Sequence, residues 1–273
     1  MRMINNLEEP QKTPDPTVIA RDLHIGYQSE SIVKNINFTV KRGQSLALVG
    51  VNGSGKSTLL KTIVGLLPPL KGDLNVLGNP PGKSPRQIAY LSQSHTSGFI
   101  LPLRALDAVR MGRFANHGLL GKMTSVDEDL VVQAMKSMQV WDLVDKPLRS
   151  LSGGQQQRVY IAQVLARHAD LLILDEPTAG LDAGAREVYQ EVIRNELTRG
   201  ASVITATHDI QEAMDCDQAM LLARKVIALG RGKDIITTQT LLETFGIVMT
   251  MNKQNLEMTV VEREHGHDIH HHE

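Results

Sequence analysis

The chain has 273 residues, of which 41% are hydrophobic and 3% aromatic, and its formal net charge is −1. This length is close to the upper size for one hydrophobic core, so we expect a single α/β domain with an aliphatic core. The near-zero charge provides no general attraction to nucleic acid, and we expect no nucleic-acid partner. The single cysteine, Cys216, excludes an intramolecular disulfide, and no apolar run approaches the ~20 residues that cross a bilayer.

The two ends of the chain differ in composition from the rest. Residues 1–16 are polar and contain proline, so we expect a flexible leader rather than a secretory signal. Residues 251–273 are expected to form a C-terminal tail, which ends in the histidine-rich segment 264–273. This segment has three interpretations: a metal-responsive segment, an unstructured tail without a role, or an expression tag, which is disfavoured because only three histidines are contiguous.

The first part of the chain alternates apolar and polar residues, which is typical of half-buried antiparallel strands. Such strands are predicted at 18–27 and 36–40. A short apolar strand is expected at 45–49, followed by a helix at 57–66. After a further short strand, at 88–91, apolar residues recur at helical spacing.

This helical spacing predicts an inserted helical subdomain over about residues 94–168. Strands then return and alternate with helices, which indicates a mainly parallel sheet covered on both faces. The predicted strands are at 171–174, 202–206, 219–222 and 226–229, and the predicted helices are at 184–197 and 238–245. One α/β domain is therefore expected over 17–250, with an N-terminal antiparallel part and the helical insertion.

A glycine-rich segment lies between the strand at 45–49 and the helix that follows it. Its residues are Gly50, Val51, Asn52, Gly53, Ser54, Gly55, Lys56, Ser57 and Thr58. The glycines allow successive amide groups to point at one anion, and the helix N-terminus adds positive potential. Lys56 can reach the β- and γ-phosphates of a nucleotide, and the Ser57 hydroxyl can ligate Mg²⁺. An ordinary strand-to-helix turn is the weaker interpretation.

Two carboxylates follow the apolar run at 171–174. Asp175, at the end of the predicted strand, is expected to hold Mg²⁺, because open α/β sheets bind ligands at the carboxyl ends of their strands. Glu176 projects differently and can deprotonate the attacking water. The alternative, that both are solvated residues at a strand end, is less favoured here because Pro177 follows them directly.

Three further side chains follow predicted strands. His208 is expected to contact the γ-phosphate and to orient Glu176 and the water. Gln93 can ligate Mg²⁺ or bind a water through its amide oxygen, although a surface-loop glutamine is a serious alternative. Tyr27 offers a surface on which a base can stack, and the alternative is an edge-strand tyrosine that only packs.

A second anion-binding feature is the pentapeptide Leu151-Ser152-Gly153-Gly154-Gln155. Ser152 suits a helix N-cap, and Gly153 and Gly154 expose backbone N–H groups. One small domain cannot easily fold this segment and the glycine-rich segment onto a single phosphate. We therefore expect a homodimer in which two chains, placed head to tail, complete each other's sites, whereas the simpler interpretation is a capped helix.

Taken together, these motifs resemble the ATP-binding subunits of ABC transporters over about residues 18–246. The resemblance implies the P-loop NTPase core of this family. It identifies the Walker A loop at 50–58, the Walker B strand at 171–176 with Glu176 as catalytic residue, and the signature at 151–155. It also matches Gln93 to the Q-loop, 179–182 to the D-loop, His208 to the H-loop and Tyr27 to the A-loop aromatic residue. No motif carries a disabling substitution, so the resemblance implies a competent ATPase.

The resemblance can be narrowed to metal importers. Met111-Gly112-Arg113 is similar to a segment of metal and siderophore importers, and 221–230 is similar to the zinc and manganese branch. The implied partners are polytopic membrane permease subunits and, indirectly, an extracytoplasmic metal-binding protein. The implied location is peripheral, at the cytoplasmic face of the inner membrane. A loop at 94–99, ending in Phe99, is expected to dock on the membrane subunits.

Other functions of the same family stay open at this point. One is an iron or siderophore importer ATPase, and another is a soluble ABC ATPase of iron–sulfur assembly. Export of a drug or lipid is also open, because no sequence feature sets the direction of transport. Co-purification with a polytopic membrane protein would separate the transport ATPases from the soluble ones.

Overall fold

The computed structural model describes residues 16–93, 103–117, 121–246, 248–251 and 258–261, and the structural statements below concern this part of the chain. The elements up to the start of the helical subdomain are β1 (Pro16–Tyr27), β2 (Glu30–Lys41), β3 (Ser45–Val49), α1 (Lys56–Val64), β4 (Lys71–Val76), η1 (Pro85–Gln87) and β5 (Ile88–Leu91). The helical subdomain contains α2 (Ala105–His117), α3 (Ser125–Ser137), η2 (Trp141–Leu143), η3 (Leu148–Ser150) and α4 (Gly153–Ala166). The remaining elements are β6 (Leu171–Asp175), α5 (Ala183–Arg199), β7 (Ser202–Thr207), α6 (Ile210–Asp215), β8 (Gln218–Leu222), β9 (Val226–Gly230), α7 (Gly232–Ile235), α8 (Thr238–Phe245), β10 (Val248–Met251) and β11 (Met258–Val261).

The central sheet has six strands in the order β5-β6-β7-β3-β8-β9. The first five are parallel, and β9 pairs with β8 antiparallel at the edge. A second, antiparallel sheet has the order β2-β1-β4. The expected α/β fold with an N-terminal antiparallel part is therefore confirmed. Because parallel strands end at one edge, the loops after β3, β5, β6 and β7 lie close together there.

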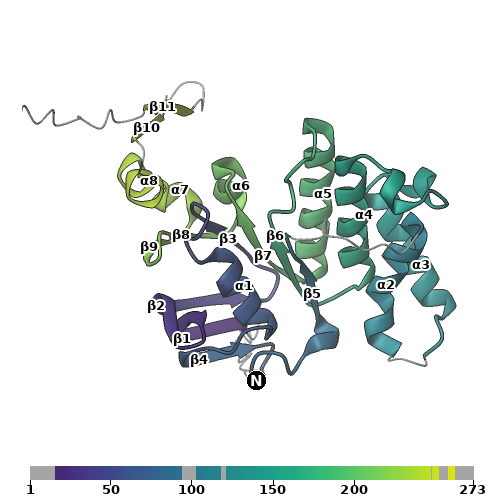
Figure 1. Ribbon diagram of the computed structural model, residues 1–273, viewed down its shortest axis with the longest axis horizontal. Helices are drawn as coiled ribbons and strands as arrows, with labels where there is room; N and C mark the ends of the chain where they lie inside the picture. The colour runs from purple at the N-terminus through teal and green to yellow at the C-terminus, as the bar shows by residue number, and fades with distance from the viewer. Residues whose placement is uncertain (1–15, 94–102, 118–120, 247, 252–257, 262–273) are drawn as a thin grey trace, which may run out of the picture.

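Helix α1 lies between the two sheets (Figure 1). Its buried side chains Leu59, Leu60 and Ile63 belong to one cluster with Leu46 and Leu48 of β3 and with apolar residues of β1, β2 and β4. On the other face of the central sheet, helices of the helical subdomain and α5 cover the strands (Figure 1). The sheet is thus buried on both faces, as its continuous apolar strands require.

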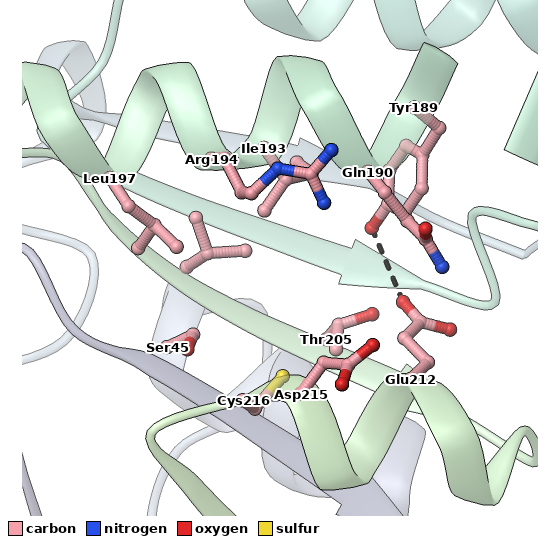
Figure 2. A pocket seen from close by; sticks show the side chains of 11 residues that line it. Ser45, Tyr189, Gln190, Ile193, Arg194, Leu197, Thr205, Glu212, Asp215 and Cys216 are labelled. Atoms are coloured by element: carbon pink, nitrogen blue, oxygen red, sulfur yellow. Dashed lines mark hydrogen bonds between the residues drawn. The ribbon is translucent and has the colours of Figure 1, made fainter. Parts of the chain in front are cut away.

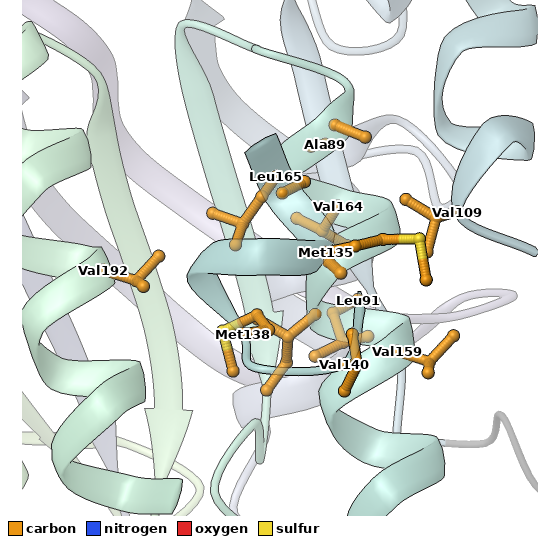
Figure 3. Close-up of a cluster of buried hydrophobic side chains, with 14 of the residues drawn as sticks. Ala89, Leu91, Val109, Met135, Met138, Val140, Val159, Val164, Leu165 and Val192 are labelled. Atoms are coloured by element: carbon orange, nitrogen blue, oxygen red, sulfur yellow. The ribbon is translucent and has the colours of Figure 1, made fainter. Parts of the chain in front are cut away.

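The helical subdomain packs α2 and α3 against α4, and its core is aliphatic and rich in methionine (Figure 3). Met135 of α3 and Met138, the C-cap of this helix, are fully buried. They share a cluster with Val109 of α2, Val159 of α4 and Leu91 of β5. This cluster connects the subdomain directly to the strand that leads to Gln93.

Several elements differ from the sequence-based expectation. Strand β2 begins at Glu30 rather than at residue 36. Strand β4 and the short helices α6 and α7 were not expected. The expected start of the tail, at residue 251, coincides with the last residue of β10, which pairs with β11. Within the described residues, no helix is both long and apolar enough to span a membrane.

Candidate nucleotide-binding site

The glycine-rich segment forms a tight loop between β3 and α1. Gly55, the N-cap of α1, has a φ of 110°, and a Cβ atom there would lie 2.5 Å from Val33 Cγ2. A Cβ atom on Gly50 would lie 2.2 Å from the backbone oxygen of Leu222. Both positions therefore require glycine, one for its conformation and one for the close approach of β8.

Lys56 is 5% exposed, and its ammonium group is held by the loop itself. The Nζ atom donates hydrogen bonds to the backbone oxygens of Gly50, at 2.6 Å, and Val51, at 3.2 Å. Burial lowers the pKa of Lys56, and the carboxylates of Glu176 and Asp175 oppose this shift. The amine is thus placed beside two acids at the mouth of the loop.

Asp175 ends β6 and is 3% exposed. Burial raises the pKa of its carboxyl group, and a hydrogen bond from the Ser57 hydroxyl opposes the shift. Its Oδ1 atom is buried and has no hydrogen-bond partner among the described residues. An unpartnered carboxylate oxygen beside a hydroxyl is a donor set that suits Mg²⁺, which prefers oxygen ligands.

Glu176 and Gln93 are brought together although 83 residues separate them. The Gln93 Nε2 atom donates a hydrogen bond of 3.0 Å to Glu176 Oε2. Glu176 also has a φ of 53°, an uncommon conformation for a non-glycine residue. Its N–H donates to the backbone oxygen of Ala206 on β7, at 2.9 Å, which anchors this conformation.

Lys56, Gln93 and Glu176 line a pocket of about 370 Å³, whereas Asp175 lies buried behind it and does not line it. It is lined by the loop residues 52–58 together with Tyr27, Ile32, Gln93, Glu176 and Arg224. Sequence reasoning missed Ile32 and Arg224. Arg224 lies in the turn between β8 and β9, and its N–H donates to the backbone oxygen of Ser54, at 3.2 Å. Its φ of 56° marks this turn, but no sequence pattern connected it to the glycine-rich loop.

The other expected site residues lie outside this pocket. His208 is exposed in the turn between β7 and α6. Ser152 caps α4, where its hydroxyl accepts a hydrogen bond from Gln155 N–H at 3.3 Å. Ser152 and Gly153 are exposed, and a Cβ atom on Gly153 would meet nothing within 4 Å. The signature segment thus presents an open helix N-terminus to its surroundings. Phe99 and the expected docking loop lie outside the described residues.

The comparisons with known proteins agree with these motifs. A family model described as ABC transporter matches residues 33–179. The manganese transport system ATP-binding protein MntB of Bacillus subtilis (strain 168) is 33% identical over 233 residues, which cover 85% of this chain and 93% of MntB. The zinc transport system ATP-binding protein AdcC of Streptococcus pneumoniae is 36% identical over 203 residues, which cover 72% of this chain and 86% of AdcC.

A solved structure has the same fold over nearly the whole chain. It is described as a metal-chelate type ABC transporter in an inward-facing conformation, and it matches with a TM-score of 0.78 at 26% identity. The match covers 91% of this chain and 98% of the solved chain. The chain therefore belongs to the ABC transporter family, as an ATP-binding subunit that hydrolyses ATP and is most like the subunits of manganese and zinc transport systems.

Proposed function

We propose that this chain powers the import of a divalent metal ion, manganese or zinc, through separate polytopic membrane subunits at the cytoplasmic face of the membrane. The observation that carries the proposal is the similarity over 93% of MntB and 86% of AdcC, which were named for manganese and zinc transport. An extracytoplasmic metal-binding protein would deliver the ion to the membrane subunits.

In the proposed site, the phosphates of ATP lie on the backbone N–H groups of 52–58, and Lys56 contacts the β- and γ-phosphates. Tyr27 stacks on the base, and Arg224 adds positive charge at the rim. Ser57, Asp175 and Gln93 would hold Mg²⁺, which neutralises part of the phosphate charge when it is bound. The orphaned Oδ1 of Asp175 supports this assignment.

We assign the proton transfer to Glu176. Its carboxylate accepts a proton from the attacking water, whose oxygen forms a bond to the γ-phosphorus. The bond from the γ-phosphorus to the bridging oxygen breaks, and ADP leaves with the electron pair. His208 orients the water and contacts the γ-phosphate. Gln93 contacts Glu176 directly, at 3.0 Å, so it is suited to transmit the state of this site to the segment that follows it.

The active unit in this proposal is a head-to-tail homodimer. Ser152, Gly153 and Gly154 do not line the pocket of their own chain, yet they present an exposed helix N-terminus. In the dimer, these residues of a second copy would bind the γ-phosphate on the open side of the pocket. Closure on ATP and opening after hydrolysis would then drive the membrane subunits.

The cargo is tested by the cellular metal content of a strain that lacks this chain, grown in metal-poor medium. We expect a shortfall of manganese or zinc that the wild-type chain restores and the Lys56→Ala variant does not. A shortfall of iron alone would assign the chain to the siderophore branch. Normal metal content would favour the iron–sulfur assembly or export functions, which co-purification with a polytopic membrane protein would then separate.

A further inference from the structure

A cavity of about 370 Å³ lies away from the nucleotide pocket, between α5 and α6 (Figure 2). Ile193 and Leu197 of α5 form part of its apolar wall. Its polar end holds two buried ionisable side chains, Tyr189 of α5 and Glu212 of α6, which are 2% and 9% exposed. Burying an ionisable group costs free energy unless hydrogen bonds compensate for the lost water. The partners of these two side chains therefore indicate their role.

Glu212 is hydrogen-bonded through both of its carboxylate oxygens. The Thr207 hydroxyl donates to Oε2 at 2.7 Å. The Tyr189 hydroxyl donates to Oε1 at 3.4 Å, which Figure 2 shows as a dashed line. Burial raises the pKa of Glu212, and the bond from Thr207 opposes the shift. Burial also raises the pKa of Tyr189 well above its usual range, which keeps its hydroxyl proton in place as a donor.

These bonds continue directly to the residues on either side of His208. Thr207 ends β7 and is 1% exposed, and its hydroxyl accepts a hydrogen bond of 3.0 Å from Asp209 N–H. Because the single hydroxyl proton goes to Glu212, all the donors in this chain of bonds point the same way, from Asp209 through Thr207 to Glu212. Such chains strengthen each bond through polarisation.

The far side of the turn is fixed as well. Asp209 caps α6, and its Oδ1 atom accepts hydrogen bonds from the N–H groups of Gln211, at 2.8 Å, and Glu212, at 3.3 Å. Asp209 is therefore held to Glu212 by two routes, one through the backbone of α6 and one through Thr207. The exposed His208 lies between two residues that this buried network fixes.

We propose that Glu212, supported by Tyr189, is a positioning residue that sets the placement of His208 for ATP hydrolysis. The proposal rests on the role of His208 given above and deepens it. Glu212 does not line the nucleotide pocket, and its hydrogen bonds to Thr207 and Asp209 connect it to the turn that carries His208. A displacement of about 1 Å at a catalytic side chain can cost about 10²-fold in rate.

The full-length chain tests this with Glu212→Ala and Glu212→Gln. Glutamine keeps an acceptor oxygen for the Thr207 hydroxyl, whereas alanine removes it. We expect Glu212→Ala to lower kcat by about tenfold or more with KM for ATP changed less than about twofold, and Glu212→Gln to recover most of the loss. The control is Gln211→Ala, a neighbouring exposed side chain of α6, for which both constants should stay at the wild-type values.

The cavity offers a second readout. Glu212 lines the cavity, so Glu212→Ala leaves an empty space that opens into the cavity. Added acetate can enter this space and replace the missing carboxylate. We expect acetate to raise kcat of Glu212→Ala and to leave the Gln211→Ala control unchanged. A kcat of Glu212→Ala equal to that of the control would overturn the proposal. If Glu212→Ala does not fold, Thr207→Val, which removes the hydroxyl at nearly constant shape, must give the same loss of kcat, and a wild-type kcat in that variant would overturn the proposal.

His208→Ala distinguishes this inference from the proposed function. If His208→Ala hydrolyses ATP at the wild-type rate, the role of His208 is wrong and the inference falls with it. If His208→Ala is inactive while Thr207→Val and Glu212→Ala keep full kcat, the role of His208 stands and only the positioning by Glu212 is wrong. In the expected case, Glu212→Ala lowers kcat no further once His208 has been replaced, because both changes act through one side chain.

Discussion

Gln93 Nε2 and Glu176 Oε2 are joined by a hydrogen bond of 3.0 Å. The bond links the ends of β5 and β6, which pair in parallel, so the two side chains leave the same edge of the sheet. Gln93 also follows Leu91, which is fully buried in the core of the helical subdomain. Glu176 is therefore connected, through Gln93, to a residue of the subdomain core that lies only two positions before Gln93 in the chain.

Replacing Glu176 by glutamine keeps the shape of this contact and removes the base. We expect ATP to bind with nearly wild-type affinity while the hydrolysis rate falls by about 10²–10⁴-fold. The closed dimer should then accumulate with ATP, which size-exclusion chromatography with light scattering measures. Glu191→Gln, an exposed glutamate of α5, is the matched control. Hydrolysis at the wild-type rate in Glu176→Gln would refute its assignment as the base.

Ser152 should act in the site of the second copy. We expect Ser152→Arg to abolish hydrolysis and to leave ATP binding at Lys56 intact, because Ser152 does not line the pocket of its own chain. Mixing it with Lys56→Ala should restore part of the hydrolysis, since one composite site of the mixed dimer has both an intact Lys56 and an intact Ser152.

Two results would speak against this arrangement. Loss of ATP binding by Ser152→Arg alone would place Ser152 in the site of its own chain. Recovery of hydrolysis at a rate that does not depend on protein concentration would mean that the two variants do not need to associate. Titration of one variant against a fixed amount of the other measures this dependence.

The sequence-based expectation agrees best with the structure where a residue follows a strand of the central sheet. Glu176, Gln93 and the loop residues 52–58 line one pocket, because parallel strands end at one edge of the sheet. Arg224 was missed because its partner is distant in sequence, and Glu212 was missed because its bonds to Thr207 and Tyr189 form only when β7, α5 and α6 pack together. The backbone N–H of Arg224 bonds to Ser54, which is 170 residues earlier, and nothing in the local pattern of either segment indicates this contact.

The missed secondary structure has the same origin. Strand β4 begins with Lys71, Gly72 and Asp73, and only Leu74 and Val76 are buried, so the strand has almost no apolar pattern. It exists because it pairs with β1 at the edge of the antiparallel sheet. Helix α6 has six residues, too few for a helical period to be recognised in the sequence. Tertiary pairing and a side-chain cap, rather than local propensity, determine both elements.

Arg224 should contribute to ATP binding, because the residue lines the pocket beside the glycine-rich loop and its charge is opposite to that of the phosphates. The residue is exposed, so water screens the interaction, and we expect Arg224→Ala to weaken ATP binding by about threefold to tenfold. Titration calorimetry at two salt concentrations measures this, and the loss should be smaller at high salt. Lys225→Ala is the control, since Lys225 is also exposed but does not line the pocket. An equal loss of ATP affinity in both variants would mean that the net charge of the chain, rather than the position of Arg224, causes the effect.

Asp175 should lower the stability of the chain at neutral pH. Burial raises the pKa of its carboxyl group. A group whose pKa is raised on folding contributes stability below its unfolded pKa, about 3.9 for aspartate, and this contribution is lost as the pH rises through the folded value. At pH 7, without Mg²⁺ or ATP, we therefore expect Asp175→Asn to have a higher Tm than the wild type, and the difference should shrink as the pH falls toward 4.

The gain in stability should come with a loss of function. Asparagine removes the charge that we assign to Mg²⁺ binding, so Mg²⁺ with ATP should raise the Tm of the wild type more than that of Asp175→Asn. Asp129→Asn, an exposed aspartate of α3, should change neither the pH dependence nor the response to Mg²⁺ with ATP. Thermal unfolding over pH 4–8 measures all three chains. A lower Tm for Asp175→Asn at pH 7 would mean that the hydrogen bond from Ser57 outweighs the cost of burial, and that the carboxylate stabilises the fold without any metal.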